Sequence, residues 1–468
     1  MKGLDINSVF FVGIGGIGMS AIAFYMLSKN IQVYGYDRVS SKITKELESK
    51  GARIIYVDET EKIDQNFLDA GKERTTVIYT PAIPRDHNIL SYFLDNGHEV
   101  VKRSDLLQRI LKGFKILAVA GTHGKTTTSS ILAHILNESI GCNAFLGGIA
   151  NNFSSNYIEN EESELAVVEA DEFDRSFLKL DPHISLITSV EADHLDVYGE
   201  EETFIQVFQE FSELTSSNGM VVKCGSVPLI EKEGLSYVTY AYEEGENCVR
   251  NLRYKNHNSF FDLNIGPTNI QEVQFKLPGK YNALNALGAS IVADRLGVEA
   301  SQIKTALESF SGIKRRFEYH IQKDDLVYID DYAHHPGELD ACIGAVRDLY
   351  PEKKITVIFQ PHLFSRTRDF MDGFARSLSK VDQLYLMDIY PAREIPIIGI
   401  NSAVLLEKIE LKKKQLVSKE DLINDVLERP HEVVLSLGAG DIDRMVEPLK
   451  KGLLSIHELI KEQDEKST

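Results

Sequence analysis

A glycine turn followed by a lysine and three threonines is the stretch of this sequence best suited to binding phosphate. Residues 118–128 read AVAGTHGKTTT, with a strand pattern before the turn and a helical pattern after it. Backbone amides of such a turn can surround phosphate oxygens, Lys125 can act as a point charge, and the Thr126 hydroxyl can bind Mg²⁺. Gly121 stands two residues later than the first glycine of the usual spacing G-x-x-x-x-G-K-[ST], so this loop is shorter than usual.

Acidic residues follow two later strand patterns, and a nucleotide site needs such acids for its metal. The stretch AVVEADEFDRSF carries four acids within 169–174, and LITSVEADHLDVYG carries His194 among further acids. Side chains just past the carboxyl end of a parallel strand lie at the edge of the sheet where ligands bind. The acids within 169–174 and His194 are therefore candidate metal ligands. A solvated acidic loop and a structural histidine are the alternatives.

A second glycine motif lies near the N-terminus, in FFVGIGGIGMSAIAFYMLSKNIQVYGYD. Gly13, Gly15 and Gly18 form G-x-G-x-x-G between a strand and a helix, and the helix N-terminus can bind a pyrophosphate. Asp37 lies 19 residues after Gly18, the spacing of a ribose-binding acid in NAD sites. Taken alone, the motif indicates a dinucleotide domain, but its chemistry requires only a diphosphate. A glycine turn that merely packs a helix on a strand is the alternative.

Polar residues also gather in the last 190 residues. The helix start PGKYNALNA places two asparagines three residues apart on one face, either as caps or as contacts to adenine or ribose. Adjacent histidines in DDYAHHP cannot easily bind one metal, so hydrogen bonding to a substrate fits them better. Arginines after the strand VIFQ suit carboxylate recognition, whereas the basic cluster KRR is either a solvated turn or a phosphate contact.

Short apolar strands alternate with helical patterns along the chain, which predicts parallel α/β sheets. One helix pattern ends at 112–113 and another near Phe310, so we expect three domains, 1–112, 113–312 and 313–468. The expected fold is a Rossmann-like N-terminal domain, a central ATPase-type α/β domain with a phosphate loop, and a C-terminal Rossmann-like α/β domain. Residues 221–278 lack helical periodicity and indicate a β-rich segment inside the central domain.

Composition and charge limit the partners and the location expected of this protein. The chain has 468 residues and a net charge of -19, which disfavours nucleic acid as a partner because phosphates would be repelled. Four scattered cysteines without a C-x-x-C pair are typical of reduced thiols. No apolar run reaches about 18 residues, so we expect a cytoplasmic protein without membrane insertion. The sequence leaves the oligomeric state open.

The motifs together resemble the Mur ligase superfamily. GIGGIGMS, AGTHGKTTT, EADEFDRSF, EADHLDVY, PGKYNALNA, RRF, DDYAHHP and QPH…RTRD occur in the order found in that family, from about residue 8 to 445. The short phosphate loop is the one that the family has. Several family members bridge their metals with a carbamoylated lysine, but LDVYGEEETFIQVFQEF offers no lysine, as in the branch that adds L-alanine. Leu363 stands where related enzymes often have a basic residue.

The resemblance implies ATP-dependent ligation of L-alanine to the lactyl carboxylate of UDP-N-acetylmuramate, through an acyl phosphate, in peptidoglycan precursor synthesis. ATP and Mg²⁺ would be required. Alternatives are a ligase that recycles a murein tripeptide on the same sugar nucleotide and, in a different class, an NAD-dependent dehydrogenase. We expect Lys125→Ala to abolish ATP turnover with the fold intact.

The resemblance also implies roles for individual residues. The UDP-sugar would be bound by Gly13, Gly15, Gly16, Gly18 and Asp37. ATP would be bound by Gly121, Thr122, His123, Gly124, Lys125, Thr126, Thr127, Asn282, Asn285, and Arg315 or Arg316. One Mg²⁺ would be held by Thr126 and Glu169 and a second by His194, so the expected catalytic residues are Lys125, Glu169 and His194. The amino acid and acceptor site would be lined by Tyr332, His334, His335 and Arg366.

Overall fold

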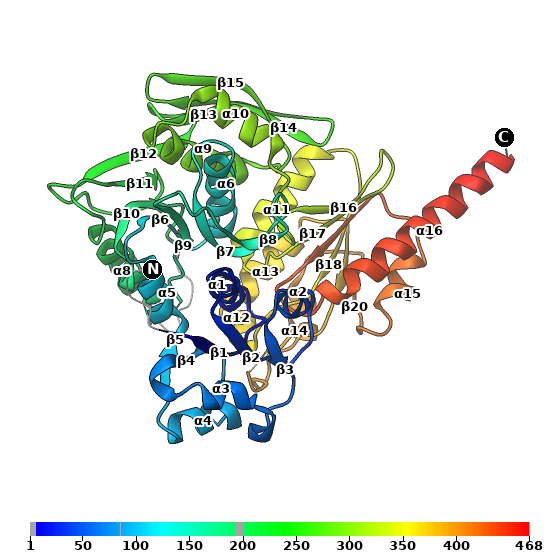
Figure 1. Ribbon diagram of the computed structural model, residues 1–468. Helices are drawn as coiled ribbons and strands as arrows, with labels where there is room; N and C mark the ends of the chain where they lie inside the picture. Colours follow the sequence, from blue (N-terminus) through cyan, green and yellow to red (C-terminus); the bar gives the residue numbers. More distant parts are fainter. Residues whose placement is uncertain are drawn as a thin grey trace. The chain divides into compact units, whose positions relative to one another are not determined.

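The structure is a computed structural model that describes residues 6–84, 86–173, 175–191, 198, 200–392 and 394–467 (Figure 1). The chain divides into two compact units. The first comprises Met1–Arg250, Asp262–Val273 and Leu284–Ser311, and the second comprises Asn251–Phe261, Gln274–Ala283 and Gly312–Thr468. The described strands form three sheets.

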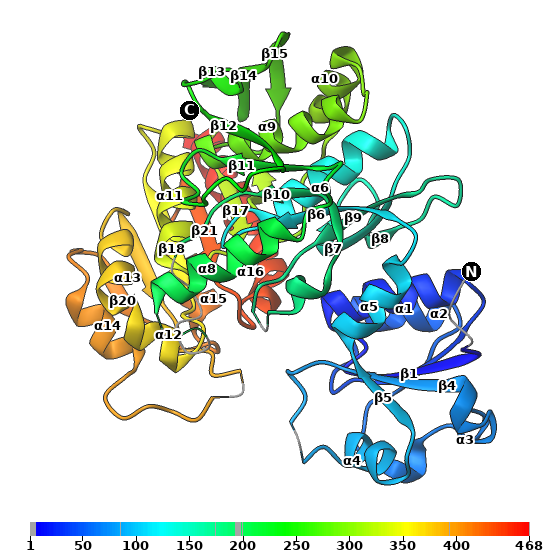
Figure 2. The same ribbon diagram turned by 90° about the vertical axis from the view of Figure 1, so that its left-hand side faces the viewer.

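The N-terminal sheet has the strand order β3-β2-β1-β4-β5, and all its pairs are parallel. Helices α1, α2 and α5 cover one face, and α3 and α4 lie on the other (Figure 2). Phe10, Phe67 and Phe93 pack together in its core. The Rossmann-like prediction is therefore confirmed. Its elements are β1 Ser8–Val12, α1 Ile17–Ser28, β2 Gln32–Tyr36, α2 Lys42–Ser49, β3 Arg53–Ile55, η1 Thr60–Lys62, α3 Gln65–Asp69, η2 Lys72–Arg74, β4 Thr75–Tyr79, α4 Asn88–Asp95, β5 Glu99–Lys102 and α5 Arg103–Leu111.

The central sheet has the order β15-β14-β13-β12-β11-β10-β6-β9-β7-β8, with β6 between β10 and β9. Both of these neighbours run parallel to β6, so their carboxyl ends meet beside the loop that follows β6. Strands β11–β15 contain no intervening helix among the described residues, which confirms the β-rich segment. The elements are β6 Lys115–Ala120, α6 Lys125–Asn137, β7 Asn143–Ala150, β8 Ser155–Ile158, β9 Leu165–Glu169, η3 Ser176–Lys179, β10 Pro182–Ile187, α8 Glu201–Glu213, β11 Met220–Cys224, β12 Ser236–Tyr242, β13 Cys248–Lys255, β14 Asn258–Ile265, β15 Thr268–Phe275, α9 Lys280–Arg295 and α10 Ala300–Ser309.

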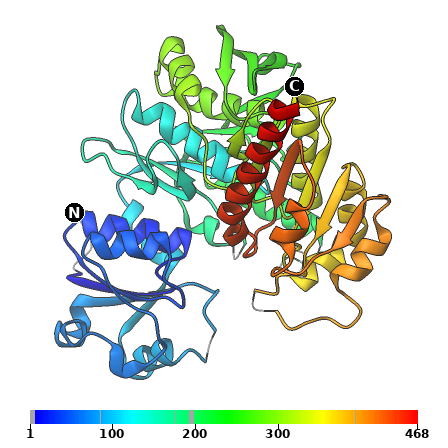
Figure 3. The same cartoon turned by 90° about the vertical axis from the view of Figure 1, so that its right-hand side faces the viewer.

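The C-terminal sheet has the order β16-β17-β21-β18-β19-β20, parallel except for β16. Helix α16 lies along this sheet (Figure 3), and Leu449 and Leu453 pack against Tyr328 and Val434. The elements are β16 Glu318–Gln322, β17 Val327–Asp331, α11 Pro336–Leu349, β18 Ile355–Phe359, α12 Phe364–Asp369, α13 Met371–Leu378, β19 Gln383–Leu386, α14 Ser402–Lys408, β20 Lys414–Leu416, α15 Leu422–Leu427, β21 Val433–Leu437 and α16 Asp443–Ser467.

The fold class predicted from the sequence is thus confirmed in all three sheets, whereas the boundaries at 112 and 312 stay a prediction. None of the helices in the described part of the chain has the length and apolar character needed to cross a membrane.

Candidate active site

The loop after β6 has the backbone of a phosphate site. Gly121 and Gly124 adopt φ of +138° and +84°, and a side chain at Gly121 would overlap the Thr188 hydroxyl. The end of β10 fixes this loop, because Thr122 donates its backbone N–H to the Ser189 carbonyl at 3.0 Å. Helix α6 begins directly at Lys125, so its first-turn amides point toward the loop and can bind phosphate oxygens.

Lys125 is held inside the loop by three acceptors. Its Nζ donates to the carbonyl oxygens of Gly121 at 2.6 Å and Thr122 at 3.2 Å, and to Oε1 of Glu172 at 2.8 Å. The side chain of Glu172 is only 1% exposed. Burial raises the pKa of Glu172, although the Lys125 ammonium acts against this. Burial alone would lower the pKa of Lys125, but Glu172 and Asp171 outweigh it and raise that pKa.

Glu169, the last residue of β9, lies beside the start of α6. Its Oε1 accepts the Thr126 hydroxyl at 3.1 Å, and its Oε2 accepts the Gly147 N–H at 3.0 Å. A carboxylate and a hydroxyl oxygen next to a phosphate loop are hard ligands of the kind that Mg²⁺ prefers, so the residues fit this metal. The structure thus brings Thr126 and Glu169 together. The third predicted metal ligand, His194, lies outside the described residues.

A cavity of about 350 Å³ joins the N-terminal glycine motif to the central domain. Its lining includes Gly16 and Gly18 at the start of α1, Arg103 at the start of α5, and Glu169. Arg103 Nη2 lies 4.0 Å from Oδ2 of Asp171, which also lines the cavity. One space therefore contacts the start of α1, the cation Arg103 and the carboxylate of Glu169 at the end of β9.

Asp37 holds the N-terminal glycine loop in shape. Its Oδ2 accepts the Gly15 N–H at 2.8 Å and its Oδ1 accepts the Val39 N–H at 3.1 Å. A side chain at Gly15 would lie 2.8 Å from Oδ2, and Gly13 has φ of +89°. These contacts account for Asp37 as a residue that positions the loop, and its contact with a ligand stays a prediction.

The two asparagines of α9 are placed differently. Asn285 is buried, and a side chain at Gly124 would lie 2.6 Å from its Oδ1, so it packs directly on the phosphate loop. Asn282 belongs to the second unit, where its Nδ2 donates to the Pro278 carbonyl at 2.7 Å. Only Asn285 is brought to the phosphate loop within one unit.

Arg315 and Arg316 both lie over the ring of Tyr332, at 5.2 and 5.1 Å from its centroid. Arg315 also donates to the buried Asp330 at 3.2 Å and to the Gly438 carbonyl at 2.6 Å. The guanidinium of Arg316 lies 3.8 Å from the Glu338 carboxylate. The ATP contact predicted for Arg315 or Arg316 stays a prediction.

The histidines of DDYAHHP have distinct environments. His335 is the N-cap of α11, since its Nδ1 accepts the Gly337 N–H at 3.3 Å, and its ring packs on Phe370. His334 lies 3.1 Å from the Glu338 carboxylate, with its ring 6.0 Å from that of His362. His335 thus has a structural contact, and the substrate contacts predicted for both histidines stay predictions.

Arg366, the remaining residue predicted for the acceptor site, lies in α12 and is only 9% exposed. Its contact with the amino acid or acceptor stays a prediction.

The sequence analysis missed three residues of the site. Glu172 was visible in the acidic run, but its pairing with Lys125 was not. Arg103 directly follows β5 at the same edge of the sheet as the glycine motif, so a cation after a strand was the available signal. Gly147 contacts Glu169 through its backbone and carries no signal in the sequence.

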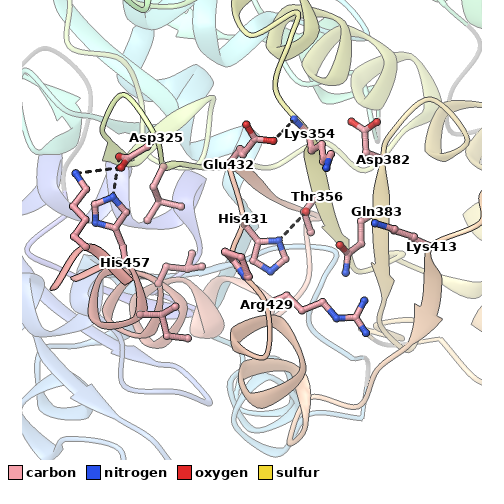
Figure 4. A pocket seen from close by; sticks show the side chains of 15 residues that line it. Asp325, Lys354, Thr356, Asp382, Gln383, Lys413, Arg429, His431, Glu432 and His457 are labelled. Atoms are coloured by element: carbon pink, nitrogen blue, oxygen red, sulfur yellow. Dashed lines mark hydrogen bonds and ion pairs between the residues drawn. The ribbon is translucent and has the colours of Figure 1, made fainter. Parts of the chain in front are cut away.

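A second cavity of about 600 Å³ lies at the amino ends of the strands of the C-terminal sheet (Figure 4). Its polar groups largely bind one another. Asp325 accepts from His457 at 2.8 Å, pairs with Lys461 at 3.1 Å, and has its pKa lowered to about 2, chiefly by the His457 hydrogen bond. The ring of His431 lies 2.9 Å from the Thr356 hydroxyl. None of the residues predicted for the active site lines this cavity.

Comparison with known proteins agrees with this geometry. Residues 8–115 match the model of the Mur ligase family, catalytic domain, residues 119–293 match the Mur ligase middle domain, and residues 315–440 match the Mur ligase, glutamate ligase domain. The chain therefore belongs to the Mur ligase family.

Comparison with individual proteins gives more detail than the family models. The UDP-N-acetylmuramate–L-alanine ligase of Parabacteroides distasonis is 46% identical over 456 residues, covering 96% of this chain and 98% of the relative. The crystal structure of UDP-N-acetylmuramate-alanine ligase from Thermotoga maritima has a TM-score of 0.79 and 27% identity, covering 96% of this chain and 99% of that one. A murein peptide ligase from Psychrobacter arcticus shares the fold, with a TM-score of 0.68 and 20% identity over 95% of this chain and 98% of that one.

Proposed function

We propose that this protein is an ATP-dependent ligase that joins L-alanine to the lactyl carboxylate of UDP-N-acetylmuramate, in peptidoglycan precursor synthesis. The relatives at 43–46% identity that carry this activity in their names match nearly the whole chain. The observation that carries the proposal is the cavity that joins the glycine motif of α1 to Glu169. It supports a sugar nucleotide whose diphosphate lies at α1 and whose carboxylate reaches the phosphate loop.

Two displacements would make the amide bond. The lactyl carboxylate attacks the γ-phosphorus of ATP, the bond to the β-phosphate oxygen breaks, and an acyl phosphate and ADP form. The amine of L-alanine then attacks the acyl carbon, and phosphate leaves with the electron pair of the broken C–O bond while the nitrogen loses a proton. A carboxylate does not form an amide directly in water, because hydroxide is a poor leaving group. In the acyl phosphate, the leaving group is phosphate, which is a good one.

The chain contributes mainly positioning and neutralisation of charge. The amides of the loop and Lys125 would hold the β- and γ-phosphates, and Arg103 would orient the carboxylate of the sugar nucleotide. Thr126 and Glu169 would hold Mg²⁺, with His194 as the predicted ligand of a second ion. When bound, Mg²⁺ supplies neutralisation of the phosphate oxygens during transfer.

The amino acid and ATP would also be contacted from the C-terminal domain. From this domain, we propose Tyr332, His334, His335 and Arg366 for the acceptor and amino acid, and Arg315 or Arg316 for ATP. Asn282 and Asn285 of the central domain are the other proposed ATP contacts. The boundaries 1–112, 113–312 and 313–468 are part of the same proposal. We also propose a cytoplasmic location, supported by four buried cysteines that form no disulfide.

Phosphate release from MgATP with UDP-N-acetylmuramate tests the proposed reaction. We expect release only when L-alanine is added, and none with the murein tripeptide in its place. Release that needs the tripeptide would instead establish the recycling ligase, which the comparisons do not favour. A titration with NAD checks the dehydrogenase alternative, for which we expect no binding.

Arg103 should determine affinity for the sugar nucleotide. Replacing it by alanine removes a charge-assisted contact, worth roughly 1.5–3 kcal/mol, so we expect KM for UDP-N-acetylmuramate to rise about 10- to 100-fold. KM for ATP should stay within about 2-fold of wild type, by steady-state kinetics. Arg109→Ala is the matched control, because Arg109 lies on the same helix as Arg103, pairs with Glu99 of β5 and does not line the cavity. Equal effects of the two substitutions would contradict the assignment.

A further inference from the structure

In the structure, all three N–H donors of Lys125 are hydrogen-bonded to the protein, whereas the proposed reaction needs one of them to bind phosphate. An ammonium group has three N–H donors. Those of Lys125 are matched by the Gly121 carbonyl, the Thr122 carbonyl and the Glu172 carboxylate. A phosphate oxygen can therefore be bound by Lys125 only if one of these acceptors is exchanged.

Glu172 is the acceptor that can leave. The two carbonyls belong to the backbone of the loop, which is fixed by Ser189 and by the positive φ of Gly121. The carboxylate can rotate about its side-chain bonds. Its other oxygen, Oε2, is buried and has no hydrogen-bond partner among the described residues. Among those residues, Lys125 is therefore the one hydrogen-bond partner of the Glu172 carboxylate, through Oε1.

The main chain of Glu172 is held in place, which keeps its side chain beside the loop. The Tyr198 hydroxyl donates to the Glu172 carbonyl, and residue 172 follows three positions after the end of β9. Asp171, the neighbouring acid, makes a different contact, since its Oδ1 accepts the Phe173 N–H at 3.1 Å. Of the two acids, Glu172 is the one hydrogen-bonded to Lys125.

We propose that Glu172 is a positioning residue that is hydrogen-bonded to Lys125 until the nucleotide binds and is then exchanged for a phosphate oxygen. This inference rests on the proposed ATP site. The exchange opposes binding, because it leaves a buried carboxylate beside the phosphates without its cation. The same carboxylate recaptures the lysine when the product nucleotide leaves, so the loop is returned to its starting state.

The test measures ATP affinity in the presence of Mg²⁺ and without sugar nucleotide or amino acid, by isothermal titration calorimetry. Glu172→Gln keeps the size of the side chain and removes its charge, so we expect Kd for ATP to fall about 10-fold. KM for ATP should fall by a similar factor, with KM for UDP-N-acetylmuramate unchanged. Asp171→Asn, which removes the adjacent charge, should change Kd for ATP by less than about 2-fold.

The outcomes separate this inference from the proposed function. Unchanged or weaker ATP binding by Glu172→Gln would overturn the inference, as would an equal effect of Asp171→Asn, because the effect would then be one of overall charge. In a Lys125→Met background, Glu172→Gln should leave Kd for ATP within about 2-fold, since the effect passes through the ammonium. Failure of the wild-type protein to bind MgATP at all would instead overturn the proposed function.

Discussion

Lys125→Ala should lose ATP-dependent phosphate release by about 100- to 1,000-fold, the usual cost of removing a donor that stabilises developing charge. It should also destabilise the fold. Lys125 and Glu172 form a pair with side chains that are 15% and 1% exposed, and removal of one partner from a buried pair costs about 3–5 kcal/mol. The buried ion pair therefore predicts a lower free energy of unfolding for this variant, in addition to the loss of ATP turnover expected from the sequence.

The double variant Lys125→Met/Glu172→Gln separates the two effects. It replaces the ion pair by neutral side chains of similar length, so its free energy of unfolding in urea experiments should return to within about 1 kcal/mol of wild type while activity stays lost. A single Lys125→Ala protein that unfolds at the wild-type midpoint would show that the pair contributes nothing to stability.

The stability defect of Lys125→Ala should depend on pH. Burial raises the pKa of Glu172 to about 7 even beside Lys125, and loss of the lysine raises it further. A carboxyl with a raised folded-state pKa is tolerated while protonated, and the folded state loses stability as pH rises through that pKa. The difference from wild type should thus be smaller at pH 5 than at pH 8 in urea unfolding experiments.

Much of the fold and of the site was predictable because the decisive signals are local. Glycines at fixed offsets after a strand specify loops that only glycine can form, and Gly121 and Gly124 adopt positive φ. The proximity of Thr126 and Glu169 follows from a general rule, since Glu169 ends β9 and Thr126 begins the helix after the loop that follows the neighbouring parallel strand β6.

The remaining features depend on packing between distant segments. Arg103 enters the cavity of Glu169 only because two domains meet there, across 66 residues of sequence (169 minus 103). Arg315 is hydrogen-bonded to Asp330 and to the Gly438 carbonyl, which are 15 and 123 residues away in the sequence. His335 caps α11, and the sequence alone does not show this contact. A residue type has several uses, and only the neighbours supplied by the fold decide between them.

Glu169→Gln should reduce kcat by about 100- to 1,000-fold, since metal-assisted neutralisation of the phosphates is worth several kcal/mol and each 1.4 kcal/mol is tenfold in rate. Glutamine keeps the size of the side chain and can still accept the Thr126 hydroxyl, so the fold should persist. The Mg²⁺ concentration that gives half-maximal phosphate release should rise, and added Mg²⁺ should partly restore the rate. If Glu169→Gln required the same Mg²⁺ concentration as the wild-type protein, the proposed role of Glu169 would be contradicted.

Gly147→Ala tests the orientation of the same carboxylate without changing its charge. A side chain at Gly147 would overlap the Glu169 carboxylate, which must then turn away from Thr126. We expect kcat to fall about 10-fold, which corresponds to a loss of about 1.4 kcal/mol of transition-state stabilisation by the misplaced metal ligand. The Mg²⁺ requirement should also rise. Gly344→Ala is the matched control, because its new side chain would meet open space on helix α11 and should leave both values unchanged. If Gly147→Ala also left them unchanged, the orientation of Glu169 seen here would not be the one that the reaction uses.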